Sequence, residues 1–220
     1  MSSIPADVER ALMVAHQIRP FEVLDERVLA RLGEVPREIF VPPHQRALAY
    51  ADATIPLGRG QVMLPPAIDA RLVQAVNVQP GDHVLEVGTG SGYLTAVLAG
   101  LADHVHSVEI IPEFKVRAAR NLETLGVHNV TLEVGDASRG WGRHKPYDVI
   151  LVSGALPLGP APAFRESLAV GGRMVVIVGG GPAEVRLITR VTPDYDHEES
   201  LFETDVPALV NAPKPERFQF

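Results

Sequence analysis

The sequence contains no cysteine among its 220 residues. Disulfide bonds, thiolate metal ligands and a cysteine nucleophile are therefore excluded. It also lacks any apolar run near the roughly 18 residues that a membrane helix needs. Its N-terminal residues, with early acidic side chains, do not have the pattern of a signal peptide. We therefore expect a cytoplasmic protein that does not act at a membrane.

A basic excess is missing as well. The formal net charge is −7, whereas a dedicated nucleic-acid-binding protein usually presents a basic face. Nucleic acid is therefore not an expected partner. The eight histidines show neither His-x-x-x-His nor His-Glu-x-x-His spacing, so no metal site is expected. The remaining composition, with 46% hydrophobic and 21% charged residues, is typical of a globular chain.

The chain is predicted to form one domain in two parts. Residues 1–65 are expected to be a helical extension followed by a loop, and residues 66–220 an α/β core. In the extension, Val8, Leu12 and Ile18 fall at helical spacing, and Asp25 can cap a second helix. Residues 55–66 contain two glycines and three prolines, which is typical of a loop.

Short apolar runs alternate with helical stretches in the core. The expected helices are 66–77, 91–100, 112–124 and 161–168. The expected strands are 83–87, 105–109, 130–134, 147–153, 173–178, 185–191 and 201–206. This alternation predicts a Rossmann-like, doubly wound, mostly parallel seven-stranded sheet, closed at one edge by an antiparallel C-terminal hairpin.

Ligands of such sheets bind outside the carboxyl ends of the strands. The first candidate there is the glycine-rich segment V-L-E-V-G-T-G-S-G-Y, residues 84–93. Its glycines let the backbone turn tightly and let a ligand approach closely. A nicotinamide fingerprint needs G-x-G-x-x-G, but Tyr93 or Thr95 stands at the last position, so a nicotinamide oxidoreductase is the least favoured enzyme.

Two acidic residues follow the next two strands. Glu109 ends H-S-V-E, where a carboxylate can accept both hydroxyls of a ribose. Asp136, in Gly135-Asp136-Ala137, can accept a hydrogen bond from an adenine amino group. A glycine loop and two such acids at three successive strand ends suit an adenosyl group without a pyrophosphate.

These motifs resemble the class I methyltransferases, and more closely the protein-L-isoaspartate O-methyltransferase family. M-V-A-H-Q-I-R at 13–19, V-P-R-E-I-F-V-P at 35–42, P-L-G-R-G-Q at 56–61 and Y-D-V-I-L-V at 147–152 are similar to its segments. The resemblance implies S-adenosyl-L-methionine as cofactor, methyl transfer to isoaspartyl carboxylates of damaged proteins, and a role in protein repair. The cofactor-binding residues it implies are Glu86, Gly88, Thr89, Gly90, Ser91, Gly92, Glu109, Ile110, Gly135, Asp136 and Ala137.

The acceptor half departs from the family. Val62, Met63 and Leu64 stand where the family has Thr-Ile-Ser, and Leu64 occupies the position of its catalytic serine. Ser153 follows the fourth core strand, and Asp205-Val206 replaces a basic segment. The candidate acceptor-site residues are therefore Val62, Met63, Ser153, Asp205 and Val206. The departures predict weak binding of an isoaspartyl carboxylate.

Two alternatives follow from these departures. A divergent member could methylate another small acceptor, or the chain could bind the cofactor without isoaspartyl activity. The sequence does not indicate an oligomeric state.

Overall fold

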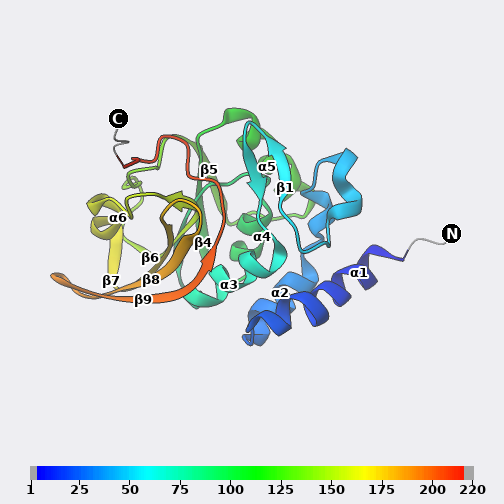
Figure 1. The fold of residues 1–220 in the computed structure, drawn as a ribbon, viewed down its shortest axis with the longest axis horizontal. Helices are drawn as coiled ribbons and strands as arrows, with labels where there is room; N and C mark the ends of the chain where they lie inside the picture. The colour runs from blue at the N-terminus through cyan, green and yellow to red at the C-terminus, as the bar shows by residue number, and fades with distance from the viewer. Residues whose placement is uncertain (1–3, 216–220) are drawn as a thin grey trace, which may run out of the picture.

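A seven-stranded sheet forms the centre of the computed structural model, which describes residues 4–215 (Figure 1). Its strands are β3 (His83–Val87), β4 (His104–Glu109), β5 (Val130–Val134), β6 (Tyr147–Leu156), β7 (Leu168–Val178), β8 (Ala183–Thr192) and β9 (Tyr195–Thr204). Their order is β5-β4-β3-β6-β7-β8-β9. The first five are parallel, and β8 and β9 are antiparallel. The predicted fold class is confirmed.

Apolar side chains on the two faces of this sheet form two hydrophobic clusters. Val84 belongs to one cluster and Leu85 to the other, because neighbouring strand residues point to opposite faces. The first cluster also includes residues of α1 (Ala6–Met13), α2 (Glu26–Glu34), α3 (Pro66–Val76), α4 (Tyr93–Ala99) and α5 (Pro112–Thr124). The second includes Phe164 of α6 (Pro162–Ser167).

The N-terminal extension is helical, as predicted. A π-helical turn, Val14–Ile18, continues α1, and short 3-10 segments follow at Arg19–Phe21, Arg37–Ile39 and Pro43–Leu48. The Asp25 carboxylate accepts a hydrogen bond from the Arg27 backbone N–H at 2.8 Å, which confirms it as the cap of α2.

Residues 55–66 are not simply a loop. They contain an antiparallel hairpin, β1 (Ile55–Gly58) and β2 (Gln61–Met63). The positive φ angles of Gly58, Arg59 and Gly60 close its turn. Gly58 and Gly60 therefore mark a tight turn between two strands, which the sequence pattern alone did not distinguish from an irregular loop.

Two core boundaries also differ from prediction. The helix expected over 161–168 ends at Ser167, and β7 begins at Leu168 and runs through Gly171-Gly172. The expected loop 192–200 is largely β9, which begins at Tyr195 and ends before Val206. Pairing with β8 explains this, since an ion pair between Arg186 and Glu198 joins the two strands. Ladder pairing overrides a polar local composition.

Along the chain, β4 and β5 lie on one side of β3, and β6 and β7 then lie on its other side. The carboxyl ends of β3 and β6 therefore flank a topological switch point. Among residues 4–215, no helix is long and apolar enough to cross a membrane.

Candidate functional site

A pocket of about 650 Å³ opens at the carboxyl ends of β3, β4, β5 and β6. Val87-Gly88, Glu109-Ile110 and Gly135-Asp136 lie at the ends of β3, β4 and β5, and Ser153-Gly154 lie within β6 just before its end. A smaller neighbouring pocket of about 330 Å³ shares Leu57, Val62, Leu64, Gly88, Gly90 and Ser153 with it. The structure therefore brings the glycine loop and both predicted acids into one continuous site.

The glycine loop passes along both pockets with a backbone that other residues rarely adopt. The φ angles of Gly88, Gly90 and Gly92 are 101°, 55° and 87°. A Cβ atom on Gly88 would also lie 2.5 Å from the Ser153 hydroxyl oxygen. Gly88 and Gly90 line the larger pocket, and Thr89 and Ser91 the smaller one, whereas Gly92 lines neither and begins α4.

The Glu109 carboxylate is buried and held in one orientation. It accepts hydrogen bonds from the backbone N–H groups of Gly90 at 2.8 Å and Ile111 at 2.9 Å. These bonds leave further lone pairs on both oxygens for a ligand that donates two hydrogen bonds. Glu109 therefore connects the glycine loop to the end of β4 and faces the pocket between them.

Asp136 is fixed in the same way at the end of β5. It accepts hydrogen bonds from the Ser138 backbone N–H at 3.0 Å and from the Asn211 amide at 2.9 Å. Burial raises the pKa of Asp136, but these hydrogen bonds outweigh it and hold the pKa below its ordinary value. The side chain is therefore ionised at neutral pH and acts as an acceptor only.

The segment Val62-Met63-Leu64 forms the wall opposite the glycine loop. Val62 and Leu64 line both pockets, and Met63 lines the smaller one. The Leu64 carbonyl accepts a hydrogen bond from the guanidinium of Arg37, which is fully buried and also pairs with Asp69 at 2.9 Å. Burial raises the pKa of Asp69 to about 6, although Arg37 opposes that shift. This buried pair fixes the backbone of the wall.

The other acceptor-site candidates are divided. Ser153 lines both pockets, but its hydroxyl lies 3.1 Å from the carbonyl oxygens of Val87 and Gly88 and donates to the glycine loop. Asp205 is exposed and Val206 is packed in the core, and neither lines a pocket. The C-terminal segment instead contributes Pro207, Leu209 and Val210.

Glu86 lies beneath the glycine loop and does not line either pocket. Its carboxyl group is fully buried and accepts hydrogen bonds from the hydroxyls of Thr95 at 2.5 Å and Ser107 at 2.6 Å. Burial raises the pKa of Glu86 to about 8, and the two hydroxyls only partly oppose this. Glu86 is therefore protonated at neutral pH and supports the loop from below, so its expected contact with a cofactor stays a prediction.

Sequence reasoning did not single out several residues that complete the site. Asp69, Tyr93 and Phe114 line it from helices, while Leu209 and Asn211 reach it from the C-terminal segment. Apart from Tyr93, which ends the glycine-rich segment 84–93, no motif contains them, because they reach the pocket only through tertiary packing. One signal was available for Asp69, because its ion-pair partner Arg37 stands beside Glu38 in the otherwise apolar segment V-P-R-E-I-F-V.

A sequence profile described as protein-L-isoaspartate(D-aspartate) O-methyltransferase matches residues 9–204. The chain belongs to this family.

Similar proteins agree with that assignment. A protein-L-isoaspartate O-methyltransferase of Roseiflexus castenholzii is 43% identical over 193 residues, covering 88% of each chain. One of Gloeobacter violaceus is 43% identical over 192 residues, covering 86% of this chain and 93% of that one. A solved protein-L-isoaspartate O-methyltransferase structure superposes with a TM-score of 0.79 at 25% identity. It covers 91% of this chain, which spans 65% of that protein's length.

The family assignment explains why the pocket combines residues from so many segments. The profile match extends from the N-terminal extension to the end of β9 and so includes the glycine loop and the Val62–Leu64 wall, but not Pro207, Leu209 and Val210. The chain is therefore an isoaspartate-methyltransferase family member over its extension as well as its sheet.

Proposed function

We propose that this protein transfers a methyl group from S-adenosyl-L-methionine to the free carboxylate of isoaspartyl residues in damaged proteins. One observation carries the proposal: the glycine loop, Glu109 and Asp136 line a single pocket that continues to the Val62–Leu64 wall. The first three suit an adenosyl group, and the wall lies where an acceptor has to approach it. Membership of the family supports the same reaction.

The residues of the larger pocket fit this cofactor. The backbone of Gly88 and Gly90 lets a ligand lie directly on the loop, where a side chain would obstruct it. Glu109 would accept hydrogen bonds from the ribose hydroxyls, and Asp136 from the adenine amino group. Ile110 and Ala137 line the same region and would contact the adenine.

The charge of the site also suits the cofactor. Three carboxylates, Glu109, Asp136 and Asp69, line the two pockets, and no arginine, lysine or histidine is among the described lining residues. Asp69 is neutralised by Arg37, which leaves Glu109 and Asp136 as the carboxylates without an ion-pair partner among the described residues. Such a site favours a cation over an anion. The bound cofactor supplies a methyl group on a positively charged sulfonium, which is an electrophile that this site accommodates.

The protein does not need to move a proton. An ionised isoaspartyl carboxylate would itself attack the methyl group that the bound cofactor would supply, so the ester C–O bond would form as the S–C bond breaks and opposite charges would be neutralised. The apolar side chains of Leu57, Val62 and Leu64 exclude water from the space beside the glycine loop. A dry environment favours a step in which charge disappears. Leu64 therefore acts through desolvation, because it offers no hydroxyl to orient the acceptor.

The two alternatives from the sequence are not favoured. Relatives at 43% identity carry the isoaspartate name, and they span most of this chain. A different acceptor, or cofactor binding without turnover, would require the activity to have been lost in a chain that keeps the family's cofactor pocket.

Labelled methyl transfer tests the proposal. The protein is incubated with labelled cofactor and either an isoaspartyl peptide or its normal aspartyl version. We expect label only in the isoaspartyl peptide, as a base-labile ester. Cofactor binding with no transfer to that peptide would contradict the proposed acceptor.

The cellular location, biological role and partner of the protein stay predictions. We propose a cytoplasmic role in protein repair, with residues 1–65 and 66–220 acting as one methyltransferase domain and with a peptide or protein as partner. Cell fractionation and the isoaspartate content of cells that lack the protein would test location and role.

A further inference from the structure

Among residues 4–215, the connection from β5 to β6 contains no helix that could cover one face of β4 and β5. The chain passes from β5 to β6 through residues 135–146, which form turns and irregular loop instead of the usual crossover helix. A helix packed on this face would require apolar side chains beneath it. The strands instead present His104 and His106 from β4 beside Thr131 and Glu133 from β5, and His104 lies 2.9 Å from the Thr131 hydroxyl.

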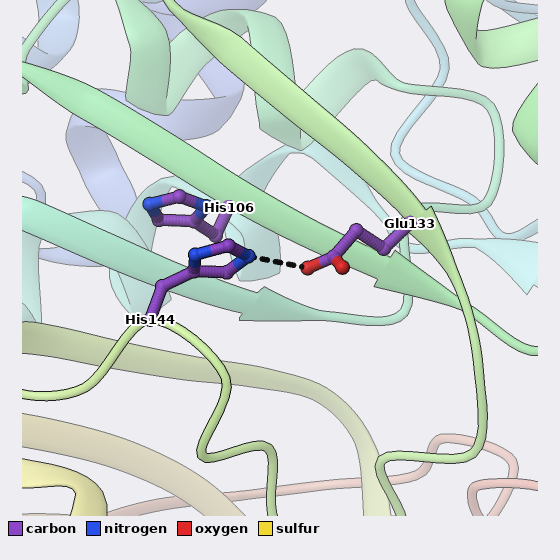
Figure 2. Close-up of side chains that lie close together, drawn as sticks. All are labelled: His106, Glu133 and His144. Atoms are coloured by element: carbon purple, nitrogen blue, oxygen red, sulfur yellow. Dashed lines mark hydrogen bonds and ion pairs between the residues drawn. The ribbon is translucent and has the colours of Figure 1, made fainter.

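Three of the side chains here converge. Figure 2 shows His106 and Glu133 on neighbouring strands and His144 on the loop that passes beside them. His144 Nε2 lies 3.1 Å from the Glu133 carboxylate, and its ring is stacked on that of His106 with centroids 4.2 Å apart. The potential ligand atoms of these three residues all lie within 4.8 Å of one another. Within residues 4–215, this is the one such group of three or more side chains.

The local environment keeps these groups ready to bind a cation. The His106 ring is partly buried and packs against the rings of His104 and His144. Its Nδ1 atom is buried and has no hydrogen-bond partner among residues 4–215.

We propose that His106, Glu133 and His144 form a binding site for a divalent transition metal ion of the zinc type. Two imidazoles and a carboxylate are ligands that Zn²⁺ prefers, at about 2.0–2.2 Å each. Water completes a tetrahedral shell. The stacked rings cannot both direct a lone pair at one ion, so His144 turns on binding, and its position on a loop with 38% of its side chain exposed allows this.

The groups around Glu133 support the same site. The Trp141 indole N–H donates to the carboxylate at 3.0 Å, and Arg143 contacts it at 3.2 Å. Such outer partners hold a ligating carboxylate in place. The local sequence spacing of the histidines does not reveal the site, because its three residues come from two strands and a loop.

Zinc binding by the full, untagged chain tests the proposal. Isothermal titration with Zn²⁺ should give one site, and Co²⁺ should give the visible absorption of a low-coordinate nitrogen–oxygen site. His144→Ala, His106→Ala and Glu133→Gln should each weaken Zn²⁺ binding by about tenfold or more. His197→Ala is the matched control, since His197 lies 3.5 Å from Glu199 but has no second imidazole in such a group.

The comparison of His197→Ala with His144→Ala decides the outcome. Retained binding in His197→Ala, with loss in His144→Ala, supports the site. Equal Zn²⁺ affinity in the unaltered protein and in His144→Ala overturns it, as does the absence of any saturable site. Circular dichroism and S-adenosylhomocysteine binding report whether each variant is folded. If His106→Ala does not fold, His144→Ala and Glu133→Gln still give a decisive answer.

Discussion

Single carboxyl groups in and beneath the pocket have opposite roles. Glu109 is held by backbone N–H groups and keeps lone pairs for a ligand, whereas Glu86 is held by two hydroxyls and faces away from the pocket. Both were expected to bind the cofactor. Their environments predict that one affects affinity and the other affects stability.

Replacing Glu109 by alanine should weaken S-adenosylhomocysteine binding by about 1–3 kcal/mol, because polar partners lose their acceptor. Calorimetry measures this loss. Glu113→Ala is the control, since Glu113 is an exposed acid on the adjacent helix that pairs with Arg59 and does not line the pocket. Equal affinity of Glu109→Ala and Glu113→Ala would show that Glu109 only caps the following turn.

Glu86 should make stability depend on pH. The folded protein keeps a proton on Glu86 up to pH of about 8, whereas the unfolded chain releases it near 4.5. Between these values the unfolded state binds fewer protons, so stability falls as pH rises, by up to about 1.4 kcal/mol per pH unit. Glu86→Gln should flatten the curve of unfolding free energy between pH 6 and 8. Parallel curves for the two proteins would contradict a protonated Glu86.

At the scale of elements, the site depends on how segments far apart in the chain support one another. The carboxyl ends of the strands, the glycine loop and both acids could be predicted because each lies in a local pattern. The wall at 62–64 and its support could not. Arg37 and Asp69 come from different helical segments, and only packing brings them together beneath Leu64. The residues over the pocket from 207 to 211 depend likewise on contacts with Ala155 and Asp136.

The buried pair beneath the wall is expected to be sensitive to loss of one partner. Arg37→Met leaves Asp69 buried without its cation and should cost about 3–5 kcal/mol of unfolding free energy. Arg37→Met with Asp69→Leu removes both charges and should recover part of that loss. Denaturant titration measures both variants. A double variant less stable than the single one would mean that the ion pair itself is not what stabilises the wall.

Substitutions can introduce hydroxyl side chains into the Val62–Leu64 wall. Val62→Thr with Leu64→Ser should increase the initial rate with an isoaspartyl peptide, because a hydroxyl beside the acceptor can orient its carboxylate. Val62→Thr with Leu64→Ala is the control, since it shortens the side chain without adding that hydroxyl. Equal rates for both pairs would show that space, not hydrogen bonding, limits the reaction.

On the scale of the whole molecule, cofactor binding should stabilise the fold. S-adenosylhomocysteine at about 100 times its dissociation constant should add about 2.7 kcal/mol, which for a chain of this size raises the Tm by about 5–10 °C. NAD should give no shift, because the glycine spacing lacks its fingerprint. A shift with NAD alone would contradict the proposed cofactor. Differential scanning fluorimetry with both ligands makes the comparison.

The position of β9 affects which other polypeptides can pair with the sheet. β9 is one of the two edge strands, and it carries Asp196, Glu198, Glu199 and Glu203. An open edge is a template on which another extended chain can add as a further strand. Damaged polypeptides expose many such chains. Asp196 and Glu198 pair with arginines, but Glu199 and Glu203 pair with no arginine or lysine among the described residues, and their charge discourages such chains from adding to this edge.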